Sequence, residues 1–256
     1  MEQCILVHPS HSVGTARMRD RYIQLKKKKI TIQMWWKRKA KYEDLRAKLD
    51  KEIFKYLERK DFQKGYDDSV YYLIYKKKTN FGFEIFELEY LILTEELKIC
   101  FGLRFNEIEN IYDRIHQIES RENAYSLFID SVNLLHFNEV NRAKFKFNKT
   151  EDIDIGFKNA KFIFENYAEE YFKKYDSISK FSELVNREKY VEDLRGNFQN
   201  HGGGSKEDRA ASGIIASKIL KEKDTEDLKR KYLENITSKD LESIFNSIDK
   251  YFEKKI

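Results

Sequence analysis

The sequence predicts an α+β fold, in which an antiparallel sheet of four to five strands packs on amphipathic helices and a helical C-terminal extension follows. Two observations carry this prediction. Strand-like alternation is clustered between residues 68 and 147, whereas helical periodicity dominates after Asn148. Clustered strands followed by clustered helices are typical of α+β proteins rather than of alternating βαβ units.

The first strong element is a helix predicted over residues 38–60. Leu45, Leu49, Ile53 and Leu57 recur at helical spacing, with charged residues between them. Apolar residues at intervals of three and four lie on one side of a helix and favour burial of that side. We therefore expect this helix to pack on the sheet.

Five segments have the composition and alternation of strands. The predicted strands cover residues 70–75, 81–93, 97–105, 126–135 and 142–147. In the third segment apolar residues alternate strictly with small or polar ones, which is typical of a sheet with one core face and one polar face. A turn is predicted at residues 76–80. The pair Ile85-Phe86 breaks the alternation and predicts a bulge.

Helical periodicity then continues to the C-terminus. The first of these helices is predicted over 154–175 with Asp152 or Asp154 as its cap, and Asp176 or Ser177 opens the next. Further helices are predicted over residues 188–195 and 207–223, after Asp224, and after a capping box of Thr237 with Asp240. The domain prediction is an α+β domain at 34–186 and a helical extension at 187–256.

The basic charge of the chain is concentrated at its start. Residues 1–42 contain eleven Lys or Arg and two acidic residues, so they carry +9, and the remaining chain carries −4 of the total +5. Residues 1–33 show no sustained periodicity, and Met34 is the expected natural start. We expect a dispensable leader at 1–33 that is disordered or not native; the alternative is a basic arm for nucleic acid or an anionic membrane.

The search for a catalytic or metal-binding motif finds no complete one. His201 with the glycines at 202–204 resembles an esterase oxyanion-hole string, but the partner motif G-x-S-x-G is absent, so this stretch is interpreted as a linker. Glu107 and Glu109 are weak catalytic-acid candidates without a visible partner. No histidine or cysteine spacing indicates a metal site. We therefore expect a protein without enzymatic activity, cofactor or metal; an enzyme whose active-site residues converge only in space is the third hypothesis.

The expected location of the protein is the cytoplasm. No apolar run approaches the length needed to cross a bilayer, and the N-terminus lacks the ordered charged and apolar regions of a signal peptide. The chain has two cysteines, Cys4 and Cys100, which cannot form a disulfide framework.

Basic side chains on the polar face of the predicted sheet are the candidate binding residues. They are Lys98, Arg104, Arg142, Lys144 and Lys146. Basic residues beside aromatic ones on an open sheet can clamp single-stranded nucleic acid. We expect Arg104, Lys144 and Lys146 to face solvent. The interpretation that we prefer, because the body of the chain is slightly acidic, is an ordinary solvated face on which lysine discourages edge pairing; the nucleic-acid clamp is the alternative.

Part of the chain resembles a bacterial family of unknown function. The residues that carry the resemblance are the string Leu-Arg-Ala-Lys-Leu-Asp-Lys-Glu-Ile at 45–53, then Phe62 and Gly65, and the string Cys-Phe-Gly-Leu-Arg at 100–104. Over about residues 42–186 the chain is similar to the domain of unknown function 4304 and its relatives. That family has no assigned catalytic residues, so none is carried over to this chain.

The resemblance implies a non-enzymatic protein-binding module, an immunity or defence-associated factor whose partner is a toxin or another defence component. The alternative hypothesis is a nucleic-acid-binding protein that uses the basic leader and the lysine-rich face of the sheet. The two hypotheses differ in the expected salt dependence, because binding that neutralises phosphates weakens steeply as salt rises.

Overall fold

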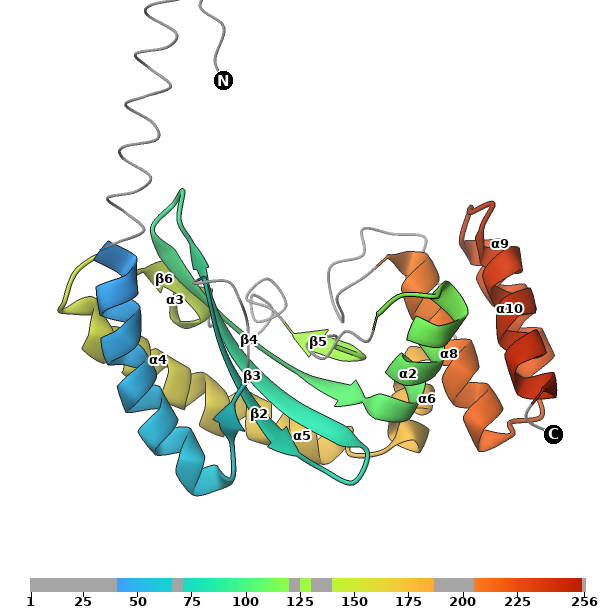
Figure 1. The fold of residues 1–256 in the computed structure, drawn as a ribbon, viewed down its shortest axis with the longest axis horizontal. Helices are drawn as coiled ribbons and strands as arrows, with labels where there is room; N and C mark the ends of the chain where they lie inside the picture. The colour runs from blue at the N-terminus through green and yellow to red at the C-terminus, as the bar shows by residue number, and fades with distance from the viewer. Residues whose placement is uncertain (1–40, 66–70, 120–124, 130–139, 187–204, 255–256) are drawn as a thin grey trace, which may run out of the picture.

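The computed structural model describes residues 41–65, 71–119, 125–129, 140–186 and 205–254. Figure 1 shows a curved sheet with helices against one face and a further group of helices at one end. Four predicted features lie outside the described residues: the leader, the start at Met34, the helix at 188–195 and the glycine run at 202–204. None of the described helices is both long and apolar enough to cross a membrane.

The described strands form one antiparallel sheet of six strands. They are β1 (Gln63–Lys64), β2 (Tyr72–Lys78), β3 (Gly82–Leu91), β4 (Glu96–Phe105), β5 (Leu127–Ile129) and β6 (Lys144–Lys146). The order along the sheet is β1-β2-β3-β4-β5, and β6 also pairs with β4. β3 pairs with β4 along its whole length, whereas β5 and β6 pair with separate stretches of β4. The predicted α+β class is confirmed.

Burial of both faces of β3 corrects the predicted bulge. β2 and β3 pair without interruption, so the pairing contains no bulge at Ile85-Phe86. Ile85 and Phe86 are each only 1% exposed although they point to opposite faces of the sheet. Two successive apolar residues can both be buried where each face of the sheet has its own cover, and a bulge with an extra residue is not needed to bury them.

The predicted turn begins later than 76–80, because β2 extends to Lys78.

Two helical segments cover one face of the sheet (Figure 1). The first is the helix at residues 41–57, which continues into the short η1 (Glu58–Lys60). The second runs without a break through α4 (Asp152–Ile163), the π-helical turn η3 (Phe164–Ala168) and α5 (Glu169–Lys174). The predictions at 38–60 and 154–175 are therefore confirmed for the described residues.

Aromatic rings join these helices to the sheet. The ring of Tyr42 stacks on that of Tyr90 in β3, with centroids 3.6 Å apart. Phe164 meets Phe86 of β3 edge to face at 5.3 Å, and it meets Phe62 at 5.4 Å in the same way. Such rings bury large areas and prefer offset or edge-on geometry, so they set how closely the helical layer approaches the sheet.

The helical group at the end of the sheet is built around α8. Its members are α2 (Asn106–His116), α6 (Ile178–Val185), α8 (Lys206–Leu220), α9 (Thr225–Asn235) and α10 (Leu241–Glu253). α8 packs against the other four, and all of its residues from Arg209 to Ser217 are buried. The helical C-terminal region thus rests on α2 and α6, which precede residue 187.

A buried polar network fixes α9 and α6 on α8. The Tyr232 hydroxyl of α9 lies 2.9 Å from Asn186 Oδ1, and Asn186 Nδ2 donates to the carbonyl oxygen of Gly213 at 3.1 Å. A Cβ atom at Gly213 would lie 2.4 Å from Asn186 Oδ1 and 2.8 Å from the Tyr232 hydroxyl. The absence of a side chain at this position therefore lets the three helices meet through hydrogen bonds.

Several local predictions are corrected by the helices. α2 was not expected, and it includes both Glu107 and Glu109. The strand predicted at 142–147 is shorter, because Arg142 belongs to the helical turn α3 (Val140–Ala143). Asp240 precedes α10 but makes no side-chain cap hydrogen bond, so the capping box predicted with Thr237 does not form. A capping box is instead present at the start of α8, between Ser205 and Asp208.

The predicted cap at Ser177 is confirmed, because its side chain accepts a hydrogen bond from the Lys180 amide at the start of α6. Asp152 does not lie ahead of α4 but is its first residue. Its carboxylate accepts hydrogen bonds from the backbone amides of Asn148 and Lys149. It therefore stabilises the turn that leads into the helix. Of the predicted strand at 126–135, residues 127–129 form β5, and 130–135 lie outside the described residues.

We predict that Gly102→Ala strongly destabilises the protein. A Cβ atom at Gly102 would lie 2.1 Å from the carbonyl oxygen of Leu127 and 2.6 Å from the Tyr125 ring, so β5 would have to move off β4. Overpacking of this kind costs on the order of 1–3 kcal/mol or more. Urea unfolding followed by circular dichroism measures the loss.

Gly156→Ala is the control for this prediction. Its nearest neighbour would be Leu49 Cδ1 at 3.3 Å, and the position lies inside α4, where alanine is favoured over glycine. We expect its free energy of unfolding to stay within about 1 kcal/mol of the wild type. Equal stability of the two variants would show that the β4–β5 pairing does not depend on Gly102.

Candidate functional site

Four of the five predicted binding residues share one face of the sheet. Lys98 of β4 lies directly opposite Lys144 of β6, and Lys146 lies opposite Glu96. Side chains two residues apart point to the same face, which places Arg104 on that face as well. The fifth residue, Arg142, belongs to α3 and not to a strand of the sheet.

Arg142 stacks on the helical layer. Its guanidinium carbon lies 3.8 Å from the centroid of the Phe162 ring in α4. A planar cation over an aromatic face is held by the ring quadrupole. The five predicted residues therefore do not form one cluster.

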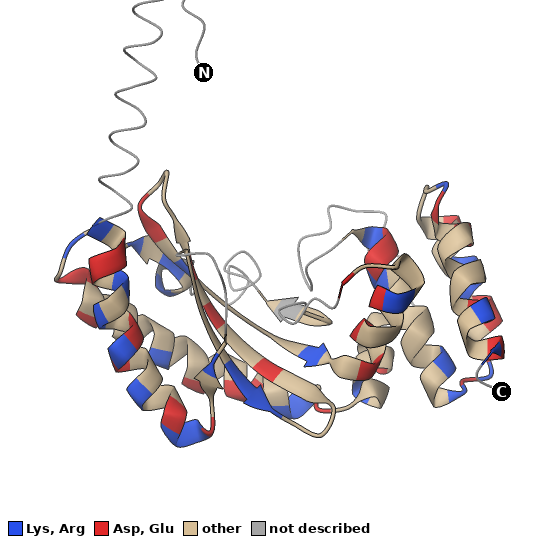
Figure 2. Ribbon diagram, viewed as in Figure 1, with Lys and Arg blue, Asp and Glu red and all other residues tan. Residues whose placement is uncertain are grey.

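Acidic neighbours offset the three lysines of this face. Lys98 Nζ lies 3.2 Å from Glu89 Oε2, and Glu96 lies 3.3 Å from Lys144 Nζ and 3.8 Å from Lys146 Nζ. Figure 2 shows basic and acidic residues intermixed over the sheet and the helices. Such pairs add little stability at the surface, but they reduce the positive potential that nucleic acid needs.

The expectation that Arg104 faces solvent is wrong. Its side chain is only 3% exposed, and its Nε donates to Asn106 Oδ1 at 3.1 Å. Tyr125 covers this part of the face: a Cβ atom at Gly102, two residues before Arg104, would lie 2.6 Å from its ring, and its hydroxyl reaches Glu87 of β3. Alternation along β4 shows which residues share a face, but it does not show what covers that face.

A buried hydroxyl–carboxylate pair holds this cover in place. Tyr125 donates to Glu87 Oε2 at 2.6 Å, and Glu87 is 8% exposed. The pKa of Tyr125 is raised well above its ordinary value. Burial is the larger cause, and the negative charge of Glu87 is the second. The tyrosine therefore keeps its proton at neutral pH and holds the segment at 125–127 on β3.

Glu109, one of the weak catalytic-acid candidates, has a structural contact. It is 4% exposed, and its Oε1 accepts a hydrogen bond from Ser126 Oγ at 2.7 Å. Ser126 Oγ accepts in turn from the Phe105 amide at 3.0 Å. This chain of hydrogen bonds joins α2 to the segment that leads into β5. The other candidate, Glu107, is exposed.

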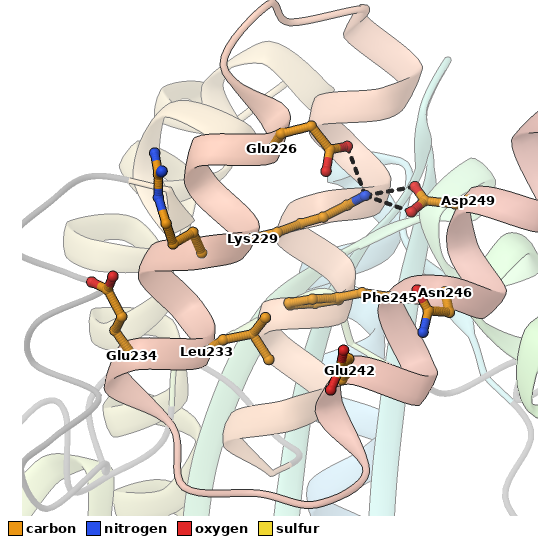
Figure 3. A pocket seen from close by; sticks show the side chains of 9 residues that line it. Glu226, Lys229, Leu233, Glu234, Glu242, Phe245, Asn246 and Asp249 are labelled. Carbon is orange, nitrogen blue, oxygen red and sulfur yellow. Dashed lines mark hydrogen bonds and ion pairs between the residues drawn. The ribbon is translucent and has the colours of Figure 1, made fainter.

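A groove of about 440 Å³ lies at the other end of the molecule, between α9 and α10 (Figure 3). From α9 it is lined by Glu226, Lys229, Arg230, Leu233 and Glu234. From α10 it is lined by Glu242, Phe245, Asn246 and Asp249. On both helices these positions recur at intervals of three and four residues. They therefore lie on the side of each helix that faces the groove.

The centre of the groove is apolar. Figure 3 shows Leu233 and Phe245 side by side between the two helices. Phe245 is 3% exposed, whereas Leu233 is 40% exposed. Phe245 therefore belongs to the core of the helical group, and Leu233 presents an apolar surface to whatever enters the groove.

One end of the groove is closed by a cluster of ion pairs. Lys229 Nζ lies 2.6 Å from Asp249 Oδ2 and 2.8 Å from Glu226 Oε1 (Figure 3). Lys218 of α8 lies 2.8 Å from Asp249 Oδ1. The Lys229 side chain is only 7% exposed, so these carboxylates replace the water that would otherwise surround its ammonium group. The cluster joins α8, α9 and α10.

Two members of this cluster, Asp249 and Lys218, have pKa values that are shifted toward their charged forms. Burial by itself would raise the pKa of Asp249, but hydrogen bonds from Lys218 and Lys229 outweigh it and hold that pKa below its ordinary value. Burial would lower the pKa of Lys218, and the hydrogen bond to Asp249 outweighs it and raises that pKa. Both shifts favour the charged forms.

Two exposed glutamates line the other end of the groove. Arg230 pairs with Asp227 at its side of the groove. Glu234 and Glu242 are both exposed, and within the described part of the chain neither has an ion-pair partner within 4 Å. The lining residues at this end of the groove therefore include two carboxylates without an ion pair, although the connection between α9 and α10 also contains the exposed Lys239.

The groove was not found from the sequence. The sequence predicts the helices that became α9 and α10, but Leu233 falls among charged residues of α9 and carries no signal of its own. The only indication of the groove in the sequence of this helix is the aliphatic Leu233, which follows Lys229 by four positions and so lies on the same side of the helix. Isolated exposed leucines are common, so this signal gains meaning only beside Phe245 of another helix.

Comparison of the chain with protein-family models, with curated proteins and with solved structures finds no match. The resemblance to the domain of unknown function 4304 therefore stays a prediction, and the case for function depends on the geometry described above.

We predict that Asp249→Asn destabilises the protein by roughly 1–3 kcal/mol at pH 7, because it leaves Lys229 and Lys218 without their shared carboxylate. The folded-state pKa of Asp249 is lowered, so its stabilisation is present above the unfolded pKa of about 3.9 and is lost as pH falls through the folded pKa. The difference between variant and wild type should therefore shrink as pH is lowered toward 3. Urea unfolding at pH 7, 5 and 3 measures it.

Asp227→Asn is the matched control, because the Asp227–Arg230 pair is exposed on both sides, at 67% and 68%. Its effect at pH 7 should stay within about 0.5 kcal/mol. A destabilisation by Asp249→Asn that is the same at every pH would contradict the ionic role of this residue.

Proposed function

We propose that the chain is a non-enzymatic protein-binding module and that the groove between α9 and α10 is its contact site. The observation that carries the proposal is Leu233, 40% exposed beside the buried Phe245 in a groove of about 440 Å³. An apolar centre with a polar, charged rim is the usual anatomy of a protein interface.

The polar groups of the groove support binding rather than proton transfer. Glu226 and Asp249 are held by Lys229, and Asp249 is also held by Lys218. These carboxylates join α9 to α8 and α10, so their hydrogen bonds keep the shape of the groove. A groove whose walls are two helix surfaces on a common buried support is a preformed binding site.

The partner is proposed to be another protein, and a toxin or defence component is the finer proposal that the family resemblance suggests. The offset charge of the sheet face makes the nucleic-acid alternative weaker, because Glu89 and Glu96 lie beside its lysines. The groove, by contrast, has an apolar centre that a protein side chain can cover.

We predict that Leu233→Asp strongly weakens peptide binding. Peptides selected from a displayed random library on the immobilised full chain should bind the variant at least tenfold more weakly, because a carboxylate in the apolar centre must be desolvated when a partner covers it. Fluorescence anisotropy with the purified peptides measures the affinity.

Leu220→Asp is the matched control, since Leu220 is 37% exposed on α8 and does not line the groove. Peptides should bind this variant as they bind the wild type. Selection of peptides that bind both variants equally would place the contact elsewhere. Failure to enrich any peptide would argue against a protein-binding module.

A further inference from the structure

The two walls of the groove are regular helical stripes. On α9 the lining positions 226, 229, 230, 233 and 234 follow the spacing i, i+3, i+4, i+7 and i+8, and on α10 positions 242, 245, 246 and 249 follow i, i+3, i+4 and i+7. The helices are joined by residues 236–240 and run antiparallel, since Lys229 meets Asp249 near one end of the groove and Glu234 and Glu242 lie near the other. Two such stripes form a seam that a third helix can enter.

The length of the seam indicates how much of a partner fits. Each stripe covers eight or nine residues, and a helix rises about 1.5 Å per residue, so the seam is about 12 Å long. An entering helix would therefore make contact over two to three turns. One large apolar residue in its middle would lie against Leu233 and above Phe245.

The charges at the edge of the groove indicate which residues should flank the apolar anchor of that helix. Glu234 and Glu242 lie on the two sides of the apolar centre, one on each helix (Figure 3). Glu234 also lies in the last turn of α9, where the helix dipole disfavours a carboxylate. A cation supplied by a partner would offset that unfavourable interaction with a favourable one. A second cation would face Glu242.

We propose, on the basis of the protein-binding function above, that the occupant of this groove is an amphipathic α-helix of another protein. It presents one large apolar anchor to Leu233 and Phe245, and Lys or Arg on both flanks to Glu234 and Glu242. Long basic side chains suit these positions, because their stems cover apolar surface while the charged ends reach the carboxylates.

The test uses the full chain and two fluorescent 18-residue peptides. One is an amphipathic helix of leucine and lysine; the other has glutamate in place of each lysine. Anisotropy should show the lysine peptide binding at least tenfold more tightly than the glutamate peptide, and more weakly at 500 mM than at 50 mM NaCl. Circular dichroism should show that the peptide gains helix on binding.

Charge reversal on the protein separates this groove from general attraction to an acidic surface. Glu234→Lys with Glu242→Lys should weaken the lysine peptide about tenfold, as expected for the reversal of two exposed charge contacts. Glu253→Lys is the control: it is an exposed glutamate of α10 outside the groove, and its effect should stay within twofold. Equal effects of the double variant and the control would overturn the proposal.

Two further outcomes are decisive. A synthetic peptide of residues 20–33 that displaces the lysine peptide at equal or lower concentration would make the chain's own basic leader the occupant, and would overturn the assignment to another protein. Library peptides that require Leu233 but are neither basic nor helical would overturn this inference and leave the protein-binding function in place. If peptides bind but none requires Leu233, this inference and the assignment of the groove as the contact site both fail, whereas the absence of any binding peptide would argue against a protein-binding module.

Discussion

Strand β4 is enclosed on both edges and both faces, and most of the fold is arranged around it. β3 pairs with it from end to end, and β5 and β6 pair with separate stretches of it. Every residue of β4 from Ile99 to Phe105 is buried. Because protein interiors are close-packed, a change in β4 would be transmitted to the helical layer on one face and to the segment at 125–127 on the other.

This enclosure explains the chemistry of the sheet's second face. A charged group that is removed from water needs a partner, and the partners are near: Glu87 accepts from Tyr125, and Arg104 donates to Asn106. Nearer the surface, Lys98 has Glu89 and Lys144 has Glu96. The charged residues of this face therefore hold strands and segments together, and they do not form an open basic surface.

The same strand supports the groove at a distance. α2 begins at Asn106, directly after β4, and packs on α8, which also carries α9 and α10. The ion pairs of Asp249 with Lys218 and Lys229 then join the outer helices to α8. Leu233 is thus displayed on a rigid base rather than on a loop, which reduces the ordering cost that binding would otherwise incur.

The sequence by itself determined the elements whose signal is local. The sequence predicts the helix at 41–57, strand β4 and the helix from Asp152 to Lys174. Periodicities of two and 3.6 residues can be recognised from residues that are close together in the sequence. Only the tertiary structure decided that Arg104 is buried, that Ile85 needs no bulge and that Leu233 lies beside Phe245. These properties depend on which distant segment covers a residue. Contacts between distant segments produce no periodic pattern in the sequence.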